Sequence, residues 1–85
     1  MPAADQRQAI GPLRRRAQEL EAQMHRLSGL IEKADAFLAR PDAFTLHSDK
    51  AQQIARDRAA LAARLAETED AWLEASDEIE KLTGG

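Results

Sequence analysis

Apolar and small residues recur along the first half of the chain at steps that alternate between three and four residues. This spacing is the heptad pattern of a helix that buries one narrow stripe against a partner helix. The stripe consists of Ile10, Leu13, Ala17, Leu20, Met24, Leu27, Ile31, Ala34 and Leu38. Pro12 is tolerated in the first turn of a helix, and Pro41 ends one. The pattern therefore predicts a helix over about residues 12–40, with residues 1–11 as a lead-in or frayed helix start.

The second half of the chain repeats the same spacing. Its stripe consists of Ala51, Ile54, Arg58, Leu61, Leu65, Thr68, Trp72, Ala75, Ile79 and Leu82. We expect a helix over about residues 48–83, capped by the Ser48 hydroxyl and ended by the two glycines that follow. The connection of about residues 41–47 is short, and short connections join antiparallel neighbours. The predicted fold is all-α, an antiparallel two-helix coiled-coil hairpin over residues 12–83.

The pairing of the two stripes follows from folding the chain near residue 46, because large apolar residues then meet apolar partners. This register pairs Leu13 with Ile79, Ala17 with Ala75, Leu20 with Trp72, Leu27 with Leu65, Ile31 with Leu61 and Leu38 with Ile54. Arg58 faces Ala34 in a weaker layer, where we expect its guanidinium to reach water over the small alanine. On the flank, the register brings Arg16 near Glu78.

Composition narrows the functional classes. The 85 residues carry a net charge of −3 and contain no cysteine, which excludes disulfides, thiolate zinc sites and thiol nucleophiles. Residues 1–40 hold seven basic and five acidic side chains (net +2), whereas residues 41–85 hold five and ten (net −5). No apolar run is long enough to span a membrane, and the start lacks the apolar core of a signal peptide. We therefore expect a cytoplasmic chain whose contact with nucleic acid, if any, depends on a local basic cluster.

Candidate catalytic residues are few. None of the four glycines begins a phosphate-binding loop, and the adjacent residues His47, Ser48 and Asp49 cannot act as nucleophile, base and orienting group together. His25 and His47 lie far apart in the hairpin and offer no metal-ligand spacing. Gly29 marks a bend or a close contact in the first helix. The sequence predicts no catalytic residue, no cofactor and no metal.

Two basic clusters are the candidate nucleic-acid-binding residues. At the turn, cations outnumber carboxylates enough to suggest contacts to phosphates; this cluster consists of Arg40, Lys50, Arg56 and Arg58, with His47 beside it. At the open end lies the run Arg14, Arg15 and Arg16, which we expect the acidic residues of the second helix to neutralise. Phe44 is expected to fold back onto Leu38 and close the end of the stripe.

Two motifs at this separation resemble the C-terminal domain of ABC-F ATPases of the Uup type. The turn reads Leu38-Ala39-Arg40-Pro41-Asp42-Ala43-Phe44, and the late element reads Trp72-Leu73-Glu74. The resemblance covers about residues 10–82. It implies a non-catalytic coiled-coil tail, attached to the ATPase domains of a cytoplasmic protein, that contacts nucleic acid weakly, either DNA or ribosomal RNA. The alternative is a protein-interaction or homodimerisation coiled coil in which two chains share the stripe.

Overall fold

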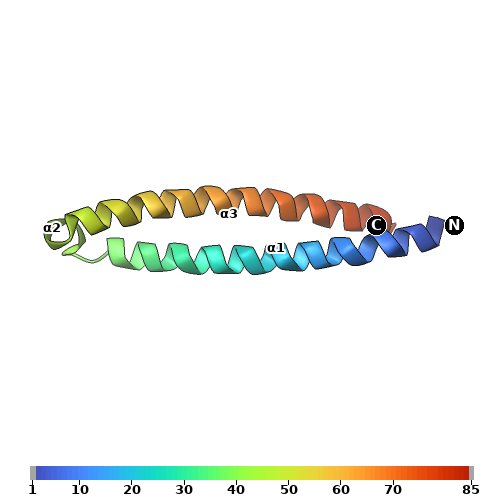
Figure 1. The fold of residues 1–85 in the computed structure, drawn as a ribbon, viewed down its shortest axis with the longest axis horizontal. Helices are drawn as coiled ribbons and strands as arrows, with labels where there is room; N and C mark the ends of the chain where they lie inside the picture. Colours follow the sequence, from blue (N-terminus) through green and yellow to red (C-terminus); the bar gives the residue numbers. More distant parts are fainter. Residues whose placement is uncertain (1, 85) are drawn as a thin grey trace.

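The computed structural model describes the backbone of residues 2–84 and the side chains of residues 9–84. Along this part of the chain there are three helices and no strands: α1 (Pro2–Leu38), α2 (Ala43–Leu46) and α3 (Ser48–Leu82). α3 runs back alongside α1, so both chain ends lie at the same end of a rod (Figure 1). The rod measures 66 by 17 by 14 Å. The prediction of an all-α fold with two long helices packed together is confirmed.

α1 begins at Pro2, well before the expected start at residue 12, so that Pro12 lies inside the helix rather than in its first turn. A proline in a helix interior removes one backbone hydrogen bond and crowds the preceding turn. Here the apolar stripe continues across the proline, since Ile10 and Leu13 are both half-buried. The helical geometry is therefore kept on both sides of Pro12, and the expected boundary at residue 12 was wrong.

The apolar stripe is the contact surface between α1 and α3. Every stripe position predicted from the heptad spacing is buried or half-buried. Leu20 is the most buried large side chain, at 3% exposed, and forms a cluster with Ala17 and Ala75. Trp72 packs against this cluster, and its indole Nε1 donates a hydrogen bond to Glu21 Oε1 at 3.1 Å. The predicted register pairs Ala17 with Ala75 and Leu20 with Trp72, and all four residues lie together in this cluster.

The stripe is buried incompletely because only two helices cover it. Among the described residues, no large side chain is fully buried. The accessible surface is 6274 Å², against about 5,000 Å² for a compact protein of the same mass. The radius of gyration is 18.9 Å, against about 12 Å for a compact domain of this length. The edges of the stripe therefore remain in contact with water.

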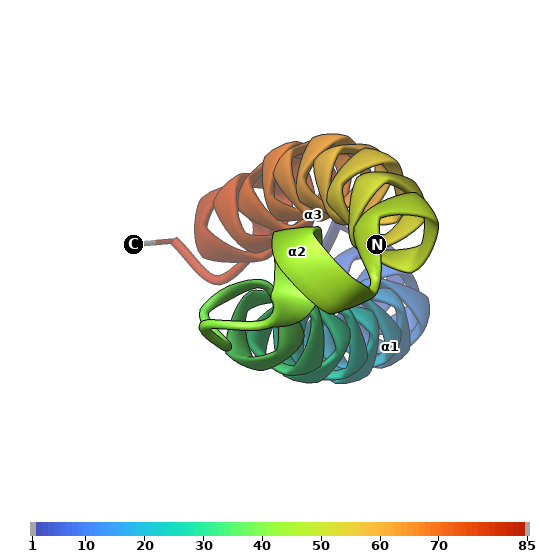
Figure 2. The ribbon, with the colours of Figure 1, turned by 90° about the vertical axis from the view of Figure 1, so that its left-hand side faces the viewer.

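A short helix closes the turn, where the sequence predicted only a connection. α1 ends at Leu38, and α2 lies across the end of the rod between α1 and α3 (Figure 2). Ala43 from α2 and Ala51 from α3 are completely buried there. Phe44 was expected to close this end, but it is 54% exposed. Two alanines allow α2 to approach closely, and the one-turn helix then directs Phe44 outward.

The start of α3 also differs from the prediction. His47, not Ser48, occupies the capping position, and no side chain accepts a hydrogen bond from the first turn. Ser48 is already part of α3, and its hydroxyl accepts a hydrogen bond from Gln52 Nε2 at 3.3 Å. The end of α3 agrees with the prediction as far as it can be followed: Gly84 has a φ of 75°, a backbone conformation that glycine adopts without strain. Gly85 lies outside the described residues.

Within residues 2–84, α1 and α3 are too polar for either to cross a lipid bilayer.

Leu20→Ala is expected to destabilise the chain by about 2–4 kcal/mol, because it leaves a cavity at the most buried layer. Leu73→Ala is the matched control, since Leu73 is 57% exposed. Urea denaturation followed by circular dichroism measures both variants. Equal midpoints for the two would show that Leu20 does not anchor the stripe.

Gly29→Ala is expected to stabilise the chain by about 0.5–1 kcal/mol. The sequence suggested a bend or close contact at this glycine, but a Cβ added there meets no atom within 4 Å. Alanine therefore gains helix propensity at no steric cost. A melting temperature below that of the wild type would contradict this.

Candidate nucleic-acid interface

The cations near the turn gather around Phe37, which lies in the last turn of α1. The Arg40 guanidinium carbon is 5.5 Å from the centre of the Phe37 ring, and Lys50 Nζ is 5.0 Å from it. The His47 ring is 6.3 Å from Phe37, centre to centre. Cations at these distances are attracted by the negative face of the ring. Phe37 thus holds side chains from both sides of the turn in one place, a role that the sequence analysis did not assign to it.

Asp42 neutralises part of this cluster. Its Oδ2 accepts a hydrogen bond from the Arg40 guanidinium at 3.3 Å and lies 3.9 Å from His47 Nε2. Arg40 therefore has a carboxylate partner within its own turn. A phosphate that approached Arg40 would compete with Asp42 for the guanidinium.

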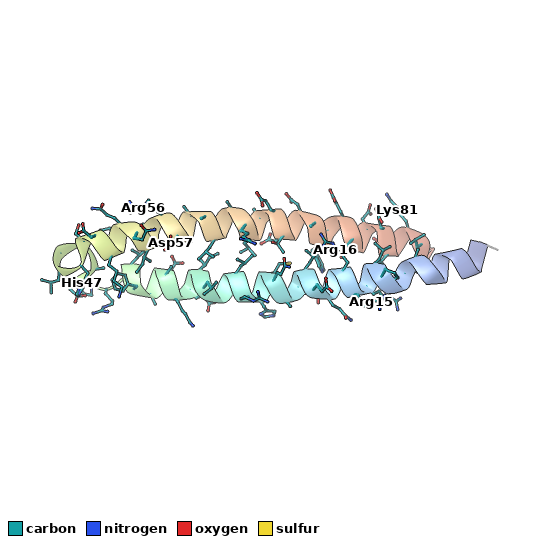
Figure 3. The ribbon with its side chains drawn as sticks, viewed as in Figure 1. Arg15, Arg16, His47, Arg56, Asp57 and Lys81 are labelled. Carbon is teal, nitrogen blue, oxygen red and sulfur yellow. The ribbon has the colours of Figure 1, made fainter. Side chains whose placement is uncertain are left out.

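Arg56 lies on the outer side of α3 (Figure 3), six residues after Lys50. Its guanidinium donates a hydrogen bond to Gln53 Oε1 at 2.9 Å, and the Gln53 amide in turn donates to Asp57 Oδ1 at 2.9 Å. Among the described side chains, neither Lys50 nor Arg56 has a carboxylate within 4.0 Å. These two cations are the ones at the turn that remain available to a phosphate.

Arg58 does not belong to this cluster. It occupies a stripe position and reaches across to Asp35 on α1, with Nε to Oδ1 at 2.6 Å and Nη2 to Oδ2 at 3.4 Å. The hydrogen bond that Arg58 donates to Asp35 and the negative charge of Asp35 raise the pKa of Arg58. The expectation that its guanidinium would lie in water over Ala34 was incomplete, because the guanidinium stays near the surface but binds the next residue of α1. Arg58 is therefore a structural residue rather than a free cation.

The arginine run at the open end is not neutralised as expected. Arg16 lies on the side of α1 toward α3 and Arg15 on the outer side (Figure 3). No carboxylate of the described side chains comes within 4.0 Å of either residue or of Arg14, and the expected Arg16–Glu78 pair is not formed. The three cations are separated from the turn by most of the length of the rod. The two predicted clusters therefore cannot act as one surface.

The charge balance differs between the two ends. Residues 35–58, which form the turn end, contain four basic and four acidic side chains. The last part of α3, residues 67–80, contains seven acidic side chains and no basic one. The three open-end arginines therefore lie beside a strongly negative helix, whereas Lys50 and Arg56 lie in neutral surroundings. The negative charge of α3 therefore repels the phosphates of a nucleic acid at the open end. The balanced charges at the turn neither attract nor repel them.

Two further arginines line a groove that the sequence analysis missed. The groove runs between the long helices at mid-rod, has a volume of about 320 Å³, and is lined by Gln23, Arg26, Leu27, Leu30, Leu61 and Arg64. No lining residue is acidic. Among the described residues, no group of histidine, aspartate and glutamate side chains is arranged to hold a metal ion.

The chain was compared with protein-family models, curated proteins and solved structures, and none of these comparisons gave a match.

Replacing Arg58 by leucine is expected to raise the melting temperature, because a leucine packs fully at a stripe position. Asp35 is half exposed, so losing its partner leaves no buried charge. Asp35→Asn is the matched comparison, since it removes the ion pair but keeps the arginine in the stripe, and we expect it to lower the melting temperature slightly. A lower melting temperature for Arg58→Leu would show that the ion pair stabilises more than apolar packing does.

Proposed function

We propose that this chain is an antiparallel two-helix coiled-coil hairpin that serves as a non-catalytic C-terminal part of an ABC-F ATPase of the Uup type and contacts nucleic acid weakly. The heptad spacing with its burial between α1 and α3 supports the coiled coil. The turn motif and the late Trp72-Leu73-Glu74 element support the family. Neither the heptad spacing nor the two motifs identify a binding partner. The proposed contact with nucleic acid is therefore argued from the charged side chains.

The observation that carries the proposal is the pair of available cations, Lys50 and Arg56. Both are exposed, both lie next to the turn, and neither has a carboxylate partner among the described side chains. Lysine and arginine side chains supply most contacts to phosphate oxygens, and such contacts position a protein without reading sequence. Phe37 keeps Lys50 near Arg40, so a phosphate at Lys50 meets a second cation.

The proposed contact is weak for two physical reasons. Of the four cations predicted at the turn, only Lys50 and Arg56 are unpaired among the described side chains. The acidic end of α3 also repels a duplex that lies along the rod. We expect a dissociation constant of about 10⁻⁴ M or weaker at physiological salt, as for non-specific binding. We expect little sequence preference, because phosphate contacts do not report base identity.

A second candidate function is protein–protein interaction. The observation that favours it is the incomplete burial of the stripe, together with the exposed apolar side chains Phe44 and Leu46 at the turn. Catalysis has no comparable support: His25 and Ser28 both line one open groove, but among the described side chains no hydrogen bond joins them.

The nucleic-acid contact is tested by titrating a labelled DNA duplex at about 50 and 200 mM salt. Replacing Lys50 and Arg56 together by glutamine is expected to remove about two phosphate contacts, and with them about 1.8 from the slope of log affinity against log salt. Neither side chain lies in the stripe, so the helix content should not change. An RNA duplex of the same length, titrated in parallel, distinguishes the two nucleic acids.

The matched control replaces Arg14 and Arg15 by glutamine, which removes the same charge at the other end of the rod. We expect this control to keep the wild-type slope. If the two double variants bind alike, net charge alone governs the interaction and the turn is not the contact site.

A further inference from the structure

The groove at mid-rod is the centre of a face whose charges change sign along its length. Residues one heptad apart lie on the same face of a helix, so the groove residues define the rest of this face. Toward the turn, the face carries Arg26, Lys33 and Arg64 against Asp57. Toward the open end, it carries Glu19, Glu67, Glu74 and Glu78 against Arg16 and Lys81. We call this surface the groove face; it is basic in one half and acidic in the other.

The centre of the groove face combines apolar side chains with the two arginines. Leu30 is 42% exposed at the rim of the groove, and Leu27 and Leu61 form the floor. The same groove continues along α3 past Ala60. An apolar centre flanked by charge is the anatomy of a protein interface.

We propose that the groove face is the interface of a homodimer in which two copies pack antiparallel about a two-fold axis. A two-fold axis brings the basic half of each copy against the acidic half of the other, so that both charge contacts are favourable at once. The occupant of the groove is thus a second copy of this chain. This inference does not depend on the proposed contact with nucleic acid.

The register of α1 and α3 specifies which residues meet. The Arg58–Asp35 and Trp72–Glu21 hydrogen bonds place each residue of α1 level with a definite residue of α3. A two-fold axis across the rod near Arg26 lays α1 of one copy along α1 of the other, and α3 along α3. Lys33 of each copy then lies beside Glu19 of the other, and Arg64 of each copy lies between Glu67 and Glu74 of the other.

The size of the face is sufficient for such a dimer. The rod is 66 Å long and 17 Å wide, so one face offers about 1,000 Å², compared with about 800 Å² per partner in a standard interface.

The mass of the chain in solution tests the proposal, measured by sedimentation equilibrium from about 1 µM to about 1 mM. We expect a concentration-dependent shift from the 9.4 kDa monomer to twice that mass. Leu30→Glu should abolish the shift. Leu73→Glu, which replaces a more exposed leucine outside the groove face, should leave it unchanged.

Charge reversal tests the antiparallel orientation. One variant combines Lys33→Glu with Arg64→Glu, and a second combines Glu19→Lys with Glu74→Lys. Each alone should be monomeric, because like charges then face each other at both contacts. An equimolar mixture of the two should form a heterodimer, because both contacts become favourable again.

Three results would overturn the proposal. A monomer at every concentration excludes the interface. A dimer that survives Leu30→Glu points instead to chains that share the stripe itself. Two charge variants that stay monomeric when mixed exclude the antiparallel pairing. None of the replaced side chains belongs to the stripe, so circular dichroism should show unchanged helix content in every variant.

Discussion

The fold depends on the burial of one apolar stripe between α1 and α3. A single amphipathic helix in water is marginal, because nucleation is costly and its apolar side stays exposed. Packing the stripe of one helix against that of the other supplies the missing stabilisation. The cluster around Leu20 and Trp72 is the best-buried part of that contact. Two helices cover the stripe from only two sides, so its edges stay at the surface of the rod. The residues that border the stripe therefore contribute both to the stability of the fold and to the surface that a partner would contact.

Polar residues within the stripe set the alignment of the helices rather than adding to their stability. Arg58 forms its ion pair across the rod only where Asp35 lies level with it, and a shift by one heptad would separate them. Thr68 is buried, but its hydroxyl donates to the carbonyl of Arg64 in its own helix, so it imposes no partner on α1. Arg58 therefore favours one register of the two helices, whereas Thr68 is compatible with any register.

The heptad spacing predicted the stripe completely because burial along a helix repeats locally and needs no knowledge of the partner. The turn was predicted poorly because its structure depends on how three segments meet in space. Ala43 is buried and Phe44 exposed, the reverse of what their hydrophobicity suggests, because α2 turns the alanine toward the rod and the phenylalanine away from it. The candidate site was predicted in part. Lys50 and Arg56 stayed available, but Arg58 was bound by Asp35, the neighbour in sequence of the alanine that it was expected to face.

Both ends of the described chain lie at one end of the rod, and the turn lies at the other (Figure 1). Any polypeptide joined to either end would leave from the same place, so the hairpin would act as a lever arm. Its length of 66 Å would hold Lys50 and Arg56 far from whatever anchors it. Two helices braced along a common stripe bend less easily than one. A small rotation at the anchored end would therefore move the turn over a large distance. The length of the hairpin, more than the affinity of the turn, would then determine which surfaces the turn contacts.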